Sequence, residues 1–147
     1  ILYGPQPSDV MTNKLDLQYA MSVISHVTHV QTLHKGEAIG YGGTYVAKED
    51  MKTATVPIGY ADGYHRSLSN KGVVLINGKR CPIVGRICMD QFMVAVDDDV
   101  VPGDEVVLMG KQDDEEITVD EIATTAETIP HEIFCDLKRI PRVFVEK

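Results

Sequence analysis

The sequence lacks several features that mark specialised classes of protein. It has no tryptophan, 6% aromatic residues, and three cysteines in 147 residues. An odd cysteine count without a CxxC pair predicts neither a disulfide framework nor a thiolate zinc site, so we expect reduced, mostly buried thiols. The sequence shows neither an apolar run of the roughly 18 residues that a membrane span needs nor a charged-then-apolar leader. We therefore expect a cytosolic protein with no membrane contact.

Positive charge is also scarce. The chain has 14 Lys and Arg against 22 Asp and Glu, a net charge of -8, which argues against binding nucleic acid through its phosphates. Much of the acidic excess lies in Asp97–Asp99 and Asp113–Glu116, beside turn-like residues. Solvated loops explain both runs. A divalent-cation site is the alternative, but the spacing does not match a calcium loop.

The remaining composition is that of a single globular domain. With 44% hydrophobic and 24% charged residues, a chain of this length can bury a core of its own. The opening Ile1–Gly4, followed by Pro5 and Pro7, resembles the end of a strand that runs into a linker. Because the first residue is not methionine, we expect the sequence to begin inside a larger protein. Residues 1–10 would be the strand end and linker, and residues 11–147 a β domain.

Short strand-like segments separated by turn signals dominate the chain up to about residue 110. Runs rich in β-branched residues predict strands at 17–33 (broken near Ser25–His26), 38–41, 53–58, 73–76, 80–84, 92–96, 105–109 and, at the end, 142–145. Asn77–Gly78 is the strongest hairpin signal, since both residues accept the positive φ values of a type I′ turn. The pattern predicts a mainly β fold, a Greek-key-like antiparallel β-barrel. Helices do not alternate with the strands, which disfavours a parallel sheet.

One or two short helices are expected near the C-terminus. Thr118–Glu121 has the form of a capping box, in which the Thr hydroxyl and the Glu carboxylate each accept a backbone N–H at the helix start. Ile122, Ala123 and Ala126, joined by Val119, form a short apolar stripe. Pro130 interrupts or restarts the helix, and residues 131–137 can form a second one.

Four clusters could carry chemistry. Tyr41 lies in Gly40–Gly43, where glycine allows close approach of a backbone or ligand, although a half-buried strand tyrosine is the simpler interpretation. The loop Gly59–Tyr64, followed by Arg66, matches no phosphate-binding fingerprint and is either a functional turn or a plain one.

The other two clusters lie further along the chain. In Gly85–Gln91, Cys88 could be a nucleophile activated by Arg86, or a buried structural cysteine. His131, near a predicted helix start, could contact an anion, or could be an ordinary surface histidine.

Taken in order, these segments resemble the C-terminal domain of alanine racemase over essentially the whole chain. The resemblance lies in Tyr-Gly-Gly-Thr-Tyr, Pro-Ile-Gly-Tyr-Ala-Asp-Gly-Tyr and Pro-Ile-Val-Gly-Arg-Ile-Cys-Met-Asp-Gln, followed by Pro-Gly-Asp-Glu-Val-Val-Leu-Met-Gly and Arg-Ile-Pro-Arg. It implies a pyridoxal-phosphate enzyme that interconverts L- and D-alanine, a peptidoglycan precursor. It also implies a homodimer in which this domain completes a site on the N-terminal (β/α)8 barrel of the partner subunit. The lysine that holds the cofactor would lie in that barrel, so the isolated domain is expected to be inactive.

The resemblance also implies roles for individual residues. Tyr41 matches the acid/base that exchanges the Cα proton on the L-alanine face, and Met89 matches the residue whose backbone N–H holds the substrate carboxylate. The positions near the channel to the cofactor are Tyr60, Arg66, Arg86 and Asp90. Tyr45 and Tyr64 match aromatic packing positions.

His131 departs from the family pattern, which usually has a tyrosine that contacts the cofactor phosphate. Imidazole can also donate to phosphate, but it is shorter, and its protonation varies near neutral pH.

Alternatives from other classes stay open. The fold-related amino-acid decarboxylases use a cysteine from the equivalent domain, and Cys88 makes them relevant. A racemase that prefers serine or lysine differs mainly in the absent barrel. A non-catalytic β-barrel assembly module is the remaining reading.

Overall fold

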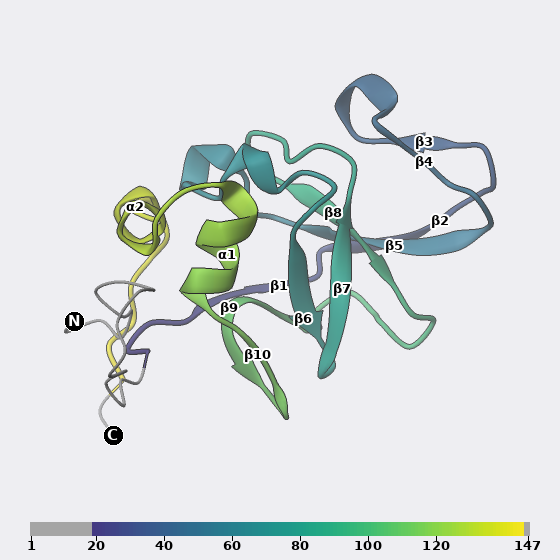
Figure 1. Ribbon diagram of the computed structural model, residues 1–147. Coiled ribbons are helices and arrows are strands. Elements are labelled where there is room, and N and C mark those ends of the chain that lie inside the picture. Colours follow the sequence, from purple (N-terminus) through teal and green to yellow (C-terminus); the bar gives the residue numbers. More distant parts are fainter. Residues whose placement is uncertain (1–18, 146–147) are drawn as a thin grey trace, which may run out of the picture.

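The computed structural model describes residues 19–145 and is mainly β (Figure 1). Its strands are β1 (Val23–His26), β2 (His29–Leu33), β3 (Ala38–Ile39), β4 (Tyr45–Val46), β5 (Met51–Val56), β6 (Val73–Ile76), β7 (Lys79–Val84), β8 (Phe92–Val96), β9 (Glu105–Gln112) and β10 (Glu115–Ile117). Two helices follow, α1 (Val119–Ala126) and α2 (Pro130–Asp136), and three short 3-10 helices cover residues 41–43, 60–62 and 66–68. The expected domain boundary at residues 10 and 11 lies outside the described residues.

The main sheet is antiparallel and curls towards a barrel. Its order is β1-β9-β6-β7-β8-β5-β2, with β10 paired to β9. The run β9-β6-β7-β8 has a Greek-key arrangement, because the fourth strand returns to lie beside the first. Only Val27 and Thr28 join the two edge strands β1 and β2, so the edges approach each other at that point. Within residues 19–145 no ladder pairs β1 with β2, and the barrel is therefore not closed by hydrogen bonds. The predicted mainly β, Greek-key-like class is confirmed.

Tight turns set the register of the hairpins. Asn77 and Gly78 have φ values of 51° and 70°, as the type I′ prediction requires, and place Ile76 opposite Lys79. A second hairpin, β9–β10, was not predicted. Its turn begins at Asp113, which adopts a φ of 53°. Short polar side chains tolerate that conformation. In the acidic run expected to be a loop, Asp113 and Asp114 form the turn and Glu115 and Glu116 begin β10.

The predicted final strand at residues 142–145 is wrong. The structure gives this described segment no strand, and Phe144 is 90% exposed. A β-branched and aromatic run favours an extended chain, but a strand also needs a neighbour to supply ladder hydrogen bonds.

The core lies between the sheet and the helices. Residues of β6 and β9 are buried on both faces, since α1 covers the strands on one side (Figure 1). The predicted stripe on α1, with Val119, is buried as expected. Thr118 caps this helix by accepting from the Glu121 backbone N–H at 3.1 Å. The Glu121 carboxylate accepts instead from Arg80, at 2.6 Å from Nη1, so only half of the predicted capping box is seen.

A second, smaller core supports the β3–β4 ribbon, which projects from the main body (Figure 1). Its buried members are Leu33, Ile39, Ala47, Val84 and Met93. The ribbon carries Tyr41 between its two strands. The position of Tyr41 therefore depends on this small cluster and on polar contacts to neighbouring loops.

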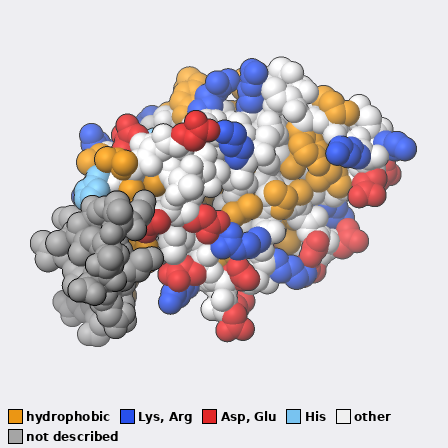
Figure 2. Space-filling model, viewed as in Figure 1, with side chains coloured by type: hydrophobic (Ala, Val, Ile, Leu, Met, Phe, Trp, Pro, Cys, Tyr) orange, Lys and Arg blue, Asp and Glu red, His pale blue; other side chains and the backbone are white. Residues whose placement is uncertain are grey.

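The surface mixes charges of both signs on the face that Figure 2 shows. Ion pairs join Lys79 to Asp97 at 2.7 Å and Arg80 to Glu115 at 2.8 Å. Among the described residues, no group of three or more His, Cys, Asp or Glu is placed to hold a metal ion. In that same part of the chain, no helix is long and apolar enough to cross a membrane.

Candidate active site

One hollow of about 560 Å³ collects most of the predicted site residues. It is lined by Tyr41, Tyr60, Arg66, Ile87, Cys88, Met89, Asp90 and Gln91. Five of these lining residues, Tyr41, Tyr60, Arg66, Met89 and Asp90, were predicted from the sequence. They come from three separate segments: the turn between β3 and β4, the loop after β5, and the loop between β7 and β8.

Tyr41 is displayed by a glycine-rich turn. Gly40, Gly42 and Gly43 all have positive φ, and the Gly43 N–H donates to the Gly40 carbonyl at 3.2 Å. A Cβ on Gly40 would lie 2.9 Å from the backbone nitrogen of Arg86, so the turn needs glycine to approach the neighbouring loop. Tyr41 is consequently 73% exposed and faces the hollow rather than the core. The simpler interpretation, a half-buried strand tyrosine, is wrong.

Two loops are held together by backbone hydrogen bonds to form the floor of the hollow. The N–H groups of Tyr60 and Ala61 donate to the carbonyls of Cys88 and Met89, both at 3.0 Å. The Cys88 N–H donates to the Gln91 carbonyl at 2.8 Å and closes a turn with Met89 and Asp90 at its tip. Met89 is 54% exposed there. The loop after β5 is thus held in place by a second segment that lines the hollow.

The C-terminal end of α2 braces the same loop from the other side. His65 Nε2 lies 2.8 Å from Asp136 Oδ2, and Arg139 donates to the Ala61 carbonyl at 3.2 Å. His131 lies near the start of α2, is exposed, and does not line the hollow. His131 is therefore not among the predicted site residues that the hollow brings together.

Charged groups of both signs surround the hollow. Arg66 and Asp90 line it, while the Arg86 guanidinium lies beside the Tyr41 turn, with Nη1 3.3 Å from where a Cβ on Gly42 would be. These cations could face an anionic or electron-rich group. The described lining includes no lysine, so covalent attachment of a pyridoxal cofactor would need a residue from elsewhere.

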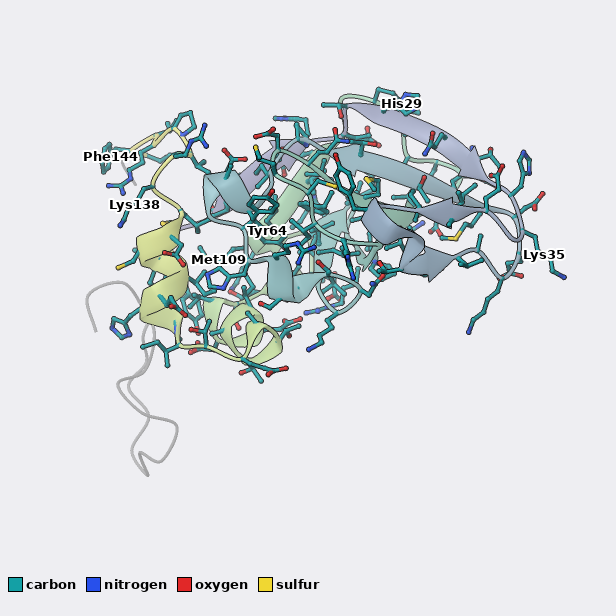
Figure 3. The ribbon with its side chains drawn as sticks, turned by 90° about the horizontal axis from the view of Figure 1, so that it is seen from above. His29, Lys35, Tyr64, Met109, Lys138 and Phe144 are labelled. Carbon is teal, nitrogen blue, oxygen red and sulfur yellow. The ribbon has the colours of Figure 1, made fainter. Side chains whose placement is uncertain are left out.

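The two tyrosines expected to pack, Tyr64 and Tyr45, do not line the hollow. Tyr64 lies among the other side chains in the body of the domain and is buried (Figure 3). Its ring stacks on that of Phe92, with the ring centroids 5.1 Å apart. Burial raises the pKa of the Tyr64 hydroxyl well above its ordinary value. Tyr45 is half-buried and donates to the Met51 sulfur at 3.4 Å. Both roles agree with the packing expected for them.

The three cysteines are free thiols in different settings. Cys88 is half-buried in the wall of the hollow, and its thiol donates to the backbone carbonyl of Arg86 at 3.5 Å. No histidine is found among the described residues that line the hollow. The nucleophilic arrangement considered for Cys88 therefore lacks a histidine base in that lining.

Cys81 is expected to alkylate far more slowly in the native chain than in the unfolded one. It is 5% exposed, and burial raises the pKa of its thiol from 9.0 to about 11. Since the thiolate is the reactive form, this shift alone slows labelling at pH 8 by about 100-fold. Iodoacetamide labelling with and without urea, read by mass spectrometry, measures the ratio. Similar native and denatured rates would contradict the buried placement.

The fold and this hollow define a mainly β domain with an open hollow lined by tyrosine hydroxyls and by charges of both signs. The family model described as "Alanine racemase, C-terminal domain" matches residues 20–144. The chain belongs to this family.

Relatives and solved structures agree with the assignment. The chain is 54% identical to the alanine racemase of Cutibacterium acnes over 146 residues, covering 97% of the chain and 38% of that protein. A crystal structure of the Bacillus anthracis alanine racemase with bound L-Ala-P superposes with a TM-score of 0.93 at 42% identity, covering 98% of this chain and 38% of that one. The Bartonella henselae alanine racemase with covalently bound pyridoxal phosphate gives a TM-score of 0.86 at 35% identity, with coverages of 97% and 39%. The chain thus spans about two fifths of the length of these relatives.

Proposed function

We propose that this chain is part of a pyridoxal-phosphate-dependent racemase, an isomerase that interconverts L- and D-alanine and so supplies a peptidoglycan precursor. The observation that carries the proposal is the convergence of Tyr41 and Met89 on one hollow. The family match and the bound ligands of the relatives support the choice of alanine and of the cofactor. A serine- or lysine-preferring racemase has no specific observation in its favour.

The hollow fits the cofactor as one wall of a shared site. Arg66, Arg86 and two tyrosine hydroxyls offer cations and hydrogen-bond partners, whereas the attachment lysine would come from the N-terminal barrel of a second subunit. The exposure of Tyr41 and Met89 supports such a partner, because proton transfer to carbon works best where water is excluded. We place the assembly in the cytoplasm, since three free cysteines suit a reducing compartment.

Racemisation needs a proton removed from one face of Cα and returned on the other. Pyridoxal phosphate, when bound, withdraws electron density from the bond that loses the proton. Tyr41 would exchange the proton on the L-alanine face, and the turn that exposes its hydroxyl leaves that group free to approach the substrate. The Arg86 guanidinium lies beside the turn that carries Tyr41, so a cation is close to the segment that would move the proton.

Met89 and the channel residues would bind and orient. Met89, at the tip of its turn, would present its backbone N–H to the substrate carboxylate. Tyr60, Arg66 and Asp90, which line the hollow, would border the path to the cofactor together with Arg86, which lies beside the Tyr41 turn rather than in the lining. His131 would contact the cofactor phosphate only if the assembly brings α2 against it.

The chain alone is expected to show no racemase activity, because half of the site is missing. The test mixes the purified 147-residue chain with pyridoxal phosphate and L-alanine and follows optical rotation, beside the full-length protein that contains it. Turnover by the chain alone would contradict the shared site. A full-length protein that racemises no alanine would contradict the activity itself.

A further inference from the structure

Asn70 connects the segments that form the walls of the hollow. It follows the 3-10 helix Arg66–Leu68 and adopts a φ of 58°. Its Oδ1 accepts the Gly85 backbone N–H at 2.7 Å, and its Nδ2 donates to Thr44 Oγ1 at 3.3 Å. One carboxamide thus bonds two segments that lie 15 residues after it and 26 residues before it.

Both partners of Asn70 adjoin predicted site residues. Thr44 directly follows the 3-10 turn Tyr41–Gly43, and Gly85 directly precedes Arg86. The two segments also touch, since a Cβ on Gly85 would lie 2.8 Å from the Ile39 carbonyl oxygen. The carboxamide therefore holds the Tyr41 turn at a defined place beside the β7–β8 loop, which carries Met89 at its tip.

The preceding residue strengthens the same connection. Ser69 Oγ accepts the Ile87 N–H at 3.0 Å and donates to the Arg66 carbonyl at 2.5 Å. Ser69 and Asn70 together hold two alternate N–H groups of the loop after β7. Arg66, which lines the hollow, is tied to that loop through the same serine.

The position calls for asparagine for two reasons. A carboxamide offers a donor and an acceptor at once, which neither a carboxylate nor an alkyl side chain does. Asparagine also tolerates positive φ better than most residues. Since Asn70 is exposed and makes no ladder contact, its bonds add little to the sheet. The hydrogen bonds of Asn70 instead fix the position of the Tyr41 turn relative to the β7–β8 loop.

We propose that Asn70 is a positioning residue that sets where the Tyr41 hydroxyl stands relative to the substrate. This inference rests on the proposed racemase function. Tyr41 sits on a ribbon outside the main core, so its place is fixed by the small core beneath the ribbon and by this carboxamide. Without the carboxamide, the Tyr41 hydroxyl is still present but its position is less well defined. Misplacement of a reacting group slows proton transfer more than it weakens substrate binding.

The test is Asn70→Gly in the full-length protein that carries this chain. Glycine keeps the positive φ and removes only the side chain. We expect kcat to fall roughly tenfold or more with little change in KM. The primary isotope effect on Cα-deuterated L-alanine should rise, whereas that on Cα-deuterated D-alanine should not, because only the L-face transfer uses Tyr41. Thr44→Val should reproduce these changes, and Thr44→Ser should restore normal kinetics.

Asn77→Gly is the matched control. Asn77 also has positive φ, 51°, and its carboxamide donates to Asp104 at 3.1 Å, but it lies in the β6–β7 hairpin and does not line the hollow. We expect this variant to keep the kinetics of the parent protein.

Amide hydrogen exchange tests whether Asn70 holds the two loops in place. Asn70→Gly should speed exchange in residues 41–46 and 85–87, and Asn77→Gly should not. Parental exchange and kinetics in Asn70→Gly would overturn the positioning role, and so would equal rises in the isotope effects of both enantiomers. If the unmodified full-length protein does not racemise alanine, the proposed function itself is overturned, whatever the effect of Asn70→Gly.

Discussion

Tyr41→Phe in the full-length protein is expected to stop exchange of the L-alanine Cα proton with solvent, while the D-alanine proton still exchanges. The substitution removes only a hydroxyl, and the ring is largely exposed, so stability should change by no more than about 0.5 kcal/mol. Turnover should fall by about 1000-fold, within the range attributed to a positioned acid or base. Two enantiomers have equal free energies, so both directions of net turnover must slow together. Exchange in D2O, followed by NMR, is therefore the readout that distinguishes the two faces.

Tyr45→Phe provides the control for that experiment. Tyr45 is a second tyrosine of the same ribbon, and its hydroxyl contacts a methionine sulfur rather than the hollow. We expect it to retain exchange of both enantiomers. Equal losses of exchange on both faces in Tyr41→Phe would remove Tyr41 from the role of L-face acid/base.

Gly59→Ala is expected to destabilise the domain by roughly 3 kcal/mol and to disrupt the hollow. Gly59 has a φ of -143°, which any residue adopts, so the backbone conformation alone gives no reason for glycine. An added Cβ, however, would lie 2.1 Å from the Met89 carbonyl oxygen and 2.4 Å from that of Cys88. Neither backbone atom can rotate away, so the loops must separate and lose the hydrogen bonds that join them. Urea unfolding measures the loss of stability.

Gly103→Ala is the comparison for the steric argument. Gly103 has a φ of 98° with nothing within 4 Å of an added Cβ, so only backbone strain of about 1–2 kcal/mol should result. If Gly59→Ala lowers the free energy of unfolding no more than Gly103→Ala does, the loops are not in close contact at Gly59.

Local signals predicted local structure well. The strands Val73–Ile76 and Phe92–Val96 have the bounds expected from their β-branched runs, and Asn77–Gly78 forms the expected turn. These features depend on torsional preferences and on neighbours a few residues away. The 142–145 segment has a similar composition but pairs with no strand among residues 19–145, which its own residues could not reveal.

The candidate site was predictable only in part for the same reason. Family motifs pointed to Tyr41, Met89 and the channel positions, and five of the predicted residues line one hollow. Gln91 ends the Pro-Ile-Val-Gly-Arg-Ile-Cys-Met-Asp-Gln motif, yet its place in the lining was not predicted. Asn70 carried no signal, because its importance arises from contacts with two distant segments. Such a residue becomes visible only when the loops are seen together.

The two ends of the curled sheet carry different kinds of loop, and substitutions at each end should have different effects. The tight hairpins β6–β7 and β9–β10 turn at the end opposite the hollow-forming loops (Figure 1). Substitutions in those turns would change the stability of the domain without changing the geometry of the hollow. Stability and activity can therefore vary separately, and a label attached at these turns should leave the hollow unchanged.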